Sequence, residues 1–382
     1  MSNVESRQRS ARTKALSARS ALPLPVRNER GEGRGVGHPT ADTSALLQAL
    51  KPSSPQPSPP AVGGEGEESG ALITYVRTRT PLRFLPFVIR HSSFILGTAF
   101  LLSALLLRAD HILIGCIGDY GSGTTNAEKV ARLVKSWKPD FIITLGDNNY
   151  PVGAEHTIDR NIGQFYHEFI HPYRGFCGAG AATNRFFPCL GNHDYLTNNA
   201  RPYFDFFTLP GNGRYYTHTH GPVQIFCLNM CQQEPDGVTN GSVQAQWLKQ
   251  ELAASIAPWR LVYFHQSPYS SGAIHGSWTH ECDVARWPFR EWGASAVLSG
   301  HDHLYERITV NGLTYFVNGL GGESWDHLHL PRVRGSQKFH TADYGAMRID
   351  ATETNLVFRF INWQGKLFDT HIMTKGRPAR GR

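Results

Sequence analysis

The sequence has six cysteines but no Cys-x-x-Cys pair, which argues against a thiolate zinc site or a dithiol redox motif. Cys227 and Cys231 would lie about 13 Å apart in an extended chain, too far to bridge each other without a turn. An oxidising compartment would permit disulfides, although spacing does not fix their connectivity. The one pairing that the sequence suggests is Cys177 with Cys189, across a Gly/Ala-rich loop.

Residues 109–382 have no net charge, because they contain 24 Lys and Arg against 24 Asp and Glu. Residues 1–108 contain 14 basic and 7 acidic side chains, so the whole formal excess of +7 lies there. A nucleic-acid-binding domain carries its basic residues on the folded face that meets the phosphates. We therefore expect no nucleic-acid partner, despite the pI of about 9.1.

Residues 1–82 have little periodic apolar patterning and are rich first in Arg and then in Pro and Gly. Such a segment buries too little apolar surface to offset the entropy lost on ordering. We predict that it is disordered and holds no domain. Since Met1 is the only methionine before the apolar run described next, we also expect the natural product to begin later, near residue 80.

The apolar run 94–107 is shorter than the roughly 20 residues that a membrane-spanning helix needs. It follows Arg90 and His91 and has the length of the apolar core of an export signal. We predict that residues 83–109 form a signal peptide and that the protein is exported, to the periplasm or out of the cell. The Leu-Arg-Ala end of the run is a poor cleavage site, so a retained membrane anchor stays open, as does a buried core helix.

Residues 110–375 show the alternating patterns of one α/β domain. The segments 111–118 and 140–146 are predicted to be buried strands, and the helical spacing of apolar residues over 126–137 predicts a parallel crossover between them. Further strands are expected at 185–191, 223–229, 260–264 and 295–300, and further helices at about 158–171 and 241–256. The last strands, expected to be antiparallel, are 314–319, 345–351 and 356–362. Together they predict a layered α/β sandwich.

Polar motifs follow five of these strands: GDYG, GDNNY, GNHD, HQS and GHDH. The carboxyl ends of strands in an α/β sheet converge on one edge, so we expect these motifs to meet. Glycine accompanies four of them and leaves room for a ligand. The side chains delivered there are Asp119, Asp147, Tyr150, Asn192, His193, His265, His301 and His303. This set suits iron, manganese or zinc and is too large for one tetrahedral ion, which predicts two metals.

Each motif alone has a simpler explanation. A strand-terminal Asp is usually a helix cap or a turn residue, and a single His on an apolar strand is usually a satisfied core residue. Tyr150 alone would be a half-buried aromatic. The five motifs in this order are what favour the metal site.

The order GD-x-G, GD-x-x-Y, GNHD, a strand-ending His and GH-x-H resembles the calcineurin-like metallophosphoesterases over about residues 111–350. The Tyr of GDNNY and the segment GHDHLYER resemble the purple acid phosphatase branch, in its small, tartrate-resistant, single-domain form. The resemblance implies a four-layer α/β/β/α sandwich and hydrolysis of phosphomonoesters by a dinuclear site, with metal-bound hydroxide as the nucleophile.

The resemblance also implies a role for each metal ligand. A ferric ion would be bound by Asp119, Tyr150 and His303. A divalent ion, which would be Fe, Zn or Mn, would be bound by Asn192, His265 and His301. Asp147 would bridge the two ions, as a carboxylate with two oxygens can.

Two histidines would act on the substrate. His193 would donate to a phosphate oxygen or to the leaving alkoxide. His275 would add a second phosphate contact, with a plain surface histidine as the alternative. Asp194 and Glu306 are expected to orient imidazoles.

Two other functions stay open. An enzyme of the same superfamily could act on phosphodiesters or pyrophosphates, although such enzymes would not usually have Tyr at position 150. A metal-dependent binding protein without turnover is the second alternative, although all eight residues of the site are present.

Overall fold

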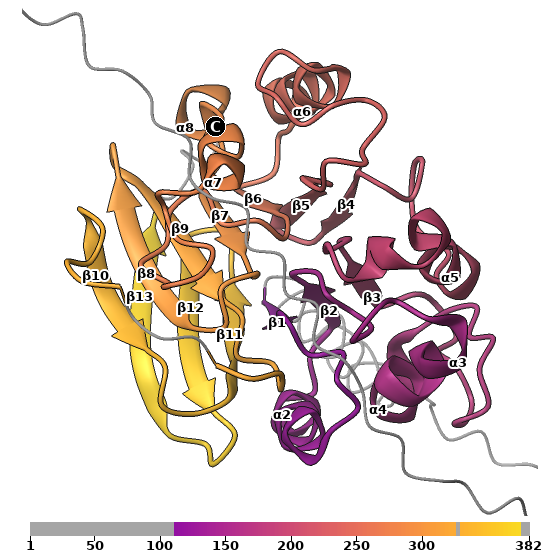
Figure 1. Ribbon diagram of the computed structural model, residues 1–382. Helices are drawn as coiled ribbons and strands as arrows, with labels where there is room; N and C mark the ends of the chain where they lie inside the picture. Colours follow the sequence, from indigo (N-terminus) through magenta and orange to yellow (C-terminus); the bar gives the residue numbers. More distant parts are fainter. Residues whose placement is uncertain (1–110, 326–328, 376–382) are drawn as a thin grey trace, which may run out of the picture. The chain divides into compact units, whose positions relative to one another are not determined.

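The computed structural model describes residues 111–325 and 329–375 (Figure 1). The predictions for residues 1–82 and for the export segment 83–109 fall outside this range. Among the helices within the described residues, none combines the length and the apolar character that crossing a bilayer requires.

Two β-sheets carry the described fold. The first has six strands in the order β13-β12-β11-β1-β2-β3. These strands are β1 (Ile112–Ile117), β2 (Phe141–Thr144), β3 (Phe186–Pro188), β11 (Gly345–Ala351), β12 (Asn355–Asn362) and β13 (Leu367–Thr374). β1, β2 and β3 are parallel to one another, as the predicted crossover requires, and β11 pairs with β1 in the antiparallel sense.

The second sheet has seven strands in the order β10-β8-β9-β7-β6-β5-β4. These strands are β4 (Tyr216–His220), β5 (Val223–Cys227), β6 (Trp259–Tyr263), β7 (Ala296–Ser299), β8 (Tyr305–Val310), β9 (Leu313–Asn318) and β10 (Ser336–His340). The prediction of an antiparallel strand at 314–319 is only half right, because β9 is antiparallel to β8 but parallel to β7. β4, β8, β10 and β13 were not predicted.

The helices are α2 (Thr125–Ser136), α3 (Glu155–Ile158), α4 (Gln164–Tyr166), α5 (Arg201–Phe206), α6 (Val243–Ala254), α7 (His280–Val284) and α8 (Phe289–Trp292). The two long helices begin at side-chain caps: Thr124 accepts from the backbone N–H of Ala127, and Ser242 accepts from that of Ala245. The single helix predicted at about 158–171 is instead a series of short helical turns, which includes a π-helical segment, Asp159–Gly163.

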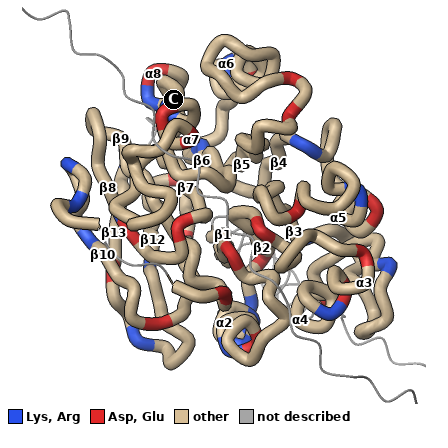
Figure 2. Tube along the Cα trace, viewed as in Figure 1, with Lys and Arg blue, Asp and Glu red and all other residues tan. Residues whose placement is uncertain are grey.

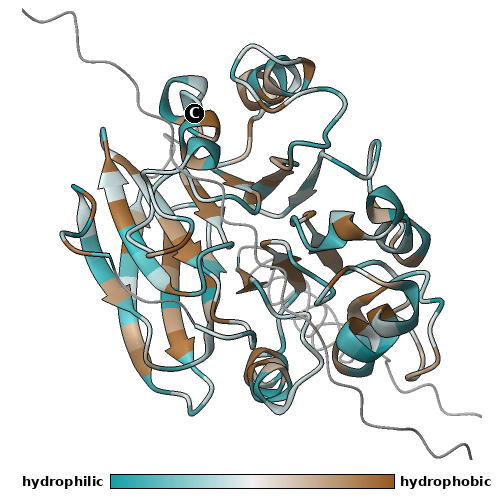
Figure 3. Ribbon diagram, in the orientation of Figure 1, coloured by the Kyte–Doolittle hydropathy of each residue, from teal (hydrophilic) through white to brown (hydrophobic). Residues whose placement is uncertain are grey.

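Three hydrophobic cores define the layers. The central core joins the sheets, with Ile114 and Ile143 from the first sheet and Leu261 and Leu298 from the second. A second core packs α2, α4 and α5 on the outer face of the first sheet, and a third packs α6 and α8 on the outer face of the second. Figure 3 shows the matching hydrophobic segments along the strands of both sheets. The predicted four-layer α/β/β/α sandwich is confirmed.

The suggested disulfide is wrong. All six cysteines, each within the described residues, are free thiols. Cys189 lies in the central core between the sheets, whereas Cys177 is exposed on a loop, where its Sγ lies 3.4 Å from Oδ2 of Asp159.

Candidate metal centre

Polar loops from both sheets meet where their parallel strands end. The ring of His265, after β6, reaches the first sheet and donates from Nδ1 to the carbonyl of Leu145, after β2, at 2.7 Å. The backbone N–H of His301, after β7, donates to Oδ2 of Asp119, after β1, at 3.0 Å. Acidic residues gather on the loops beside β1 and β2 (red in Figure 2). The five motifs therefore converge as expected, but on an edge that two sheets share.

A first group of atoms that could ligate a metal surrounds the phenol of Tyr150. Its Oη lies 3.0 Å from Oδ2 of Asp147, 3.2 Å from Oδ1 of Asp119 and 3.2 Å from Nε2 of His303. Nε2 of His303 lies 3.4 Å from Oδ1 of Asp119. The phenol has a single proton, which it can donate to only one of these atoms at a time.

A second group surrounds the ring of His265. Because Nδ1 donates to a carbonyl, the neutral ring presents the lone pair of Nε2 to the site. This Nε2 lies 2.9 Å from Oδ1 of Asn192, 3.0 Å from Nδ1 of His301 and 3.3 Å from Oδ2 of Asp147. All four groups can present lone pairs to the same small space.

The two groups share one atom, Oδ2 of Asp147, which faces both Tyr150 and His265. The side chains that meet here can all present lone pairs to the same space, and Asp119, Asp147 and His265 are buried. Buried acceptors that face one another are costly unless protons or cations lie between them. The donor set therefore fits two metal ions with Asp147 between them.

The backbone of the site is strained at three of these residues. Asp119, Asp147 and His301 have φ angles of 54°, 50° and 71°, in the left-handed region that residues with a Cβ seldom occupy. Each lies at the turn where the chain leaves a strand. Strain of this kind persists where the surrounding structure fixes it, as at ligand-binding sites.

Glycines in the motifs make room for the ligands. A Cβ at Gly191 would lie 2.2 Å from Oδ1 of Asp147, and one at Gly146 would lie 2.5 Å from Nδ1 of His265. Both positions are therefore closed to any side chain. This matches the expectation that the strand-ending glycines admit a close approach.

The charges at the centre of the site depend on one another. Burial by itself raises the pKa of Asp147, but His265, His193 and His301 hold that pKa below its usual range. Burial lowers the pKa of His265, yet Asp147 outweighs this effect and raises it to about 10. Burial, and then Asp147 and Asp119, raise the pKa of the Tyr150 phenol. Protons and metal ions therefore compete for the same atoms.

His193 lies beside the two groups, with its side chain 35% exposed. Its Nδ1 donates to the carbonyl of Pro151 at 2.6 Å, and its ring centroid lies 4.6 Å from that of Tyr150. The other nitrogen, Nε2, lies 3.9 Å from Oδ2 of Asp147. This position beside the donor atoms suits a group that acts on a substrate.

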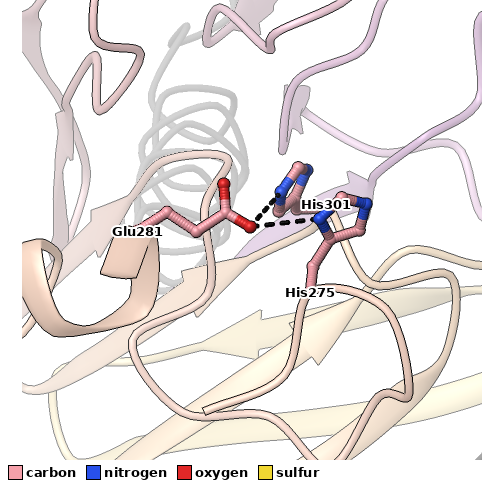
Figure 4. Close-up of side chains that lie close together, drawn as sticks. All are labelled: His275, Glu281 and His301. Carbon is pink, nitrogen blue, oxygen red and sulfur yellow. Dashed lines mark hydrogen bonds and ion pairs between the residues drawn. The ribbon is translucent and has the colours of Figure 1, made fainter. Parts of the chain in front are cut away.

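The structure places His275 beside His301, with its side chain 36% exposed. Its ring centroid lies 3.9 Å from that of His301, and its backbone N–H donates to Oδ1 of Asp302 at 3.3 Å. Its Nδ1 lies 3.0 Å from Oε1 of Glu281 (Figure 4).

Sequence reasoning missed Glu281, which lies in α7. Its Oε1 also lies 3.1 Å from Nε2 of His301. Burial by itself raises the pKa of Glu281, but the hydrogen bonds from His275 and His301 hold it below its usual range. The only sequence signal was a carboxylate six residues after His275, in a segment without a strand or an obvious helix.

Asp194 and Glu306 were expected to orient imidazoles, but each of these carboxylates holds a loop in place instead. Oδ2 of Asp194 accepts from the backbone N–H of Gly191 at 2.9 Å and from Nδ2 of Asn148 at 2.8 Å, which ties GNHD to GDNNY. Glu306 accepts from the N–H and the hydroxyl of Ser271, both at 2.7 Å. Neither carboxylate contacts an imidazole among the residues that the structure describes.

Comparisons with known proteins agree with this geometry. The family model described as calcineurin-like phosphoesterase matches residues 112–305, the stretch that contains all five motifs. Human tartrate-resistant acid phosphatase type 5 is 29% identical over 285 residues, which cover 66% of this chain and 85% of that protein. The mouse protein of the same name is 26% identical over 290 residues, with 66% and 84% covered.

Solved structures show the same fold. Purple acid phosphatase PPD1 from yellow lupin seeds aligns with a TM-score of 0.56 and 17% identity, over 69% of this chain and 54% of that one. GAP50, described as the anchor in the inner membrane complex of Plasmodium, aligns with a TM-score of 0.53 and 18% identity, over 71% and 90%. At these identities the likeness concerns the fold alone.

Proposed function

This chain belongs to the calcineurin-like phosphoesterase family, and from that premise we propose that it hydrolyses phosphomonoesters at a centre of two metal ions. That the chain is an acid phosphatase-like hydrolase follows from its family and relatives. The observation that supports a centre of two metal ions is the position of Asp147 between the two groups. Its Oδ2 faces Tyr150 of the first group and His265 of the second.

The proposed ligands divide as the two groups do. A ferric ion is held by Asp119, Tyr150 and His303, since a phenolate favours a hard trivalent ion. A divalent ion, Fe, Zn or Mn, is held by Asn192, His265 and His301, whose neutral donors suit it. Asp147 bridges the two. When bound, such a pair supplies an activated water and neutralises the charge of the phosphate ester.

Two histidines of the chain act on the substrate in this proposal. His193 is held through Nδ1 by the carbonyl of Pro151, which leaves Nε2 to donate to the leaving alkoxide. His275, whose Nδ1 lies 3.0 Å from Oε1 of Glu281, adds a second contact to the phosphate.

We also propose the bounds of the catalytic domain, the export of the protein and the class of its partner. Residues 110–375 form one catalytic domain, supported by the central core that joins strands from both ends of this range. Export through residues 83–109, with a membrane tether through 94–107 as the alternative, is supported by the sequence pattern alone. The partner is a phosphate ester rather than a nucleic acid.

The test is an assay of purified protein with a chromogenic phosphomonoester and with the corresponding bis-ester, combined with elemental analysis. We expect turnover of the monoester at low pH and much slower turnover of the bis-ester. Glu128→Gln, on the exposed side of α2 and paired with Arg132, serves as the control that keeps both activity and metals. Preference for the bis-ester would contradict the monoesterase proposal, and bound metals without turnover of either ester would favour a binding protein.

A further inference from the structure

One carboxylate oxygen contacts two imidazoles of the site. Oε1 of Glu281 lies 3.0 Å from Nδ1 of His275 and 3.1 Å from Nε2 of His301 (Figure 4). The two rings lie against each other, with centroids 3.9 Å apart. One is a proposed phosphate contact and the other a proposed metal ligand, so Glu281 joins the two functions.

The contacts fix which nitrogen of each ring donates to Glu281. An ionised carboxylate only accepts hydrogen bonds, so His301 must donate from Nε2 and His275 from Nδ1. The lone pair of His301 is then on Nδ1, the atom that lies 3.0 Å from Nε2 of His265. Nδ1 is then the atom with which His301 would hold a divalent ion. In His275 the contact with Glu281 places a proton on Nδ1.

Glu281 is held in place by its neighbour in α7. Cys282 is buried, and its thiol lies 3.2 Å from the carbonyl of His275 and 3.3 Å from that of Gly276. These contacts fasten the start of α7 to the loop that carries His275. The backbone at Glu281 is therefore held beside this loop by contacts that do not involve either imidazole.

We propose that Glu281 is a positioning residue that couples His275 to His301 through one carboxylate oxygen, an inference that rests on the proposed phosphatase function. It directs Nδ1 of His301 toward the divalent ion and holds His275 against the substrate. Carboxylates that orient metal-bound imidazoles typically change affinity or activity by about 10–100-fold when they are removed.

The first experiment compares three variants of the full chain. Glu281→Ala should lower kcat/KM by about 10–100-fold and weaken binding of the divalent ion. Glu281→Gln should recover most of the loss, because its amide oxygen can still accept both hydrogen bonds. Asp283→Asn is the matched control, since Asp283 lies in the same helix, is exposed and pairs with Arg286, and it should behave as wild type.

A double-mutant cycle separates positioning from general damage. At metal concentrations that saturate every variant, Glu281→Ala should cost much less in kcat/KM when His275 is already Ala, since the effect on substrate passes through that ring. If the losses in kcat/KM of the two single variants simply add in the double variant, the proposed coupling of Glu281 to His275 is wrong. The proposal would also be overturned if Glu281→Ala kept the metal affinity and the kcat/KM of the wild type. A third metal ion per chain, present in the wild type and lost in this variant, would contradict it too, because Glu281 would then be a metal ligand. A metal-loaded wild type without turnover would instead refute the proposed function.

Discussion

Oδ2 of Asp147 lies 3.3 Å from Nε2 of His265, although the two residues follow strands of different sheets. Asp147 follows β2 of the six-stranded sheet, and His265 follows β6 of the seven-stranded sheet. The contact closes the site across the sandwich, so each sheet supplies ligands that the other lacks. Metal binding is therefore expected to depend on the packing of the sheets and to stabilise it in turn.

Asp147→Ala is expected to be the most damaging single change among the ligands. It removes the carboxylate that both donor groups share and leaves His265 buried beside an empty position. Activity should fall by several orders of magnitude, and elemental analysis should find fewer metal ions per chain. A variant that keeps two metals would contradict the bridging role.

His193→Ala should keep its metals and lose about 10²–10⁴-fold in turnover, as expected for a positioned proton donor. The ring contacts Pro151 and Tyr150 but lies 3.9 Å from the nearest oxygen of Asp147. Steady-state kinetics with aryl and alkyl phosphates make the test, since a good leaving group needs less protonation. Equal losses for both substrates would rule out a leaving-group role.

Gly191→Ala should impair metal binding although glycine is not a ligand. The added Cβ would meet Oδ1 of Asp147 at 2.2 Å and its backbone nitrogen at 2.3 Å. Such overpacking costs about 1–3 kcal/mol of stability. Gly241→Ala is the matched control, because a Cβ there meets nothing within 4 Å. Equal metal content and equal Tm in the two variants would contradict this prediction, because they would show that the loop around Gly191 shifts at no cost in stability.

Removal of the metals should lower the thermal stability of the wild type. Ligands that bind only the folded state raise the free energy of unfolding by mass action. The increase is about 2.7 kcal/mol per site at a free ligand concentration 100 times the Kd. A chelator should therefore lower Tm, and reloading should restore it. In Asp147→Ala the chelator should have a much smaller effect. A Tm that is unchanged in the wild type after confirmed metal loss would contradict this coupling.

The colour of the iron-loaded protein tests Tyr150 without reference to substrate. A phenolate bound to ferric iron donates charge to the metal and absorbs visible light, whereas zinc has a filled d shell and cannot accept that electron. The protein should be pink to violet. Tyr150→Phe should bleach it, while Asp119, Asp147 and His303 remain to hold the ion. A colourless ferric wild type would remove Tyr150 from the ligands.

Much of this architecture could be predicted because β1, β2, β6 and β7 are almost fully buried and appear in the sequence as apolar runs. Polar motifs at the ends of such runs stand out. The assignment of each strand to one sheet or the other could not be predicted, since strands of either sheet have the same pattern. β4 and β10 were missed because they are partly exposed and lack an apolar run.

The contacts of Glu281 could not be predicted either. Its carboxylate reaches His275 and His301 from α7, a short helix whose Cys282 thiol contacts the loop that carries His275. No spacing rule in the sequence encodes that contact. The pairing of Cys177 with Cys189 failed for a similar reason, since burial of one residue and exposure of the other depend on the whole fold.

The measurement that tests the central claim most directly is elemental analysis of the purified wild-type protein alongside Asp147→Ala. The account predicts two metal ions per chain in the wild type, one of them iron, and a clear loss in the variant. One metal ion or none in an active wild type would contradict a dinuclear centre bridged by Asp147.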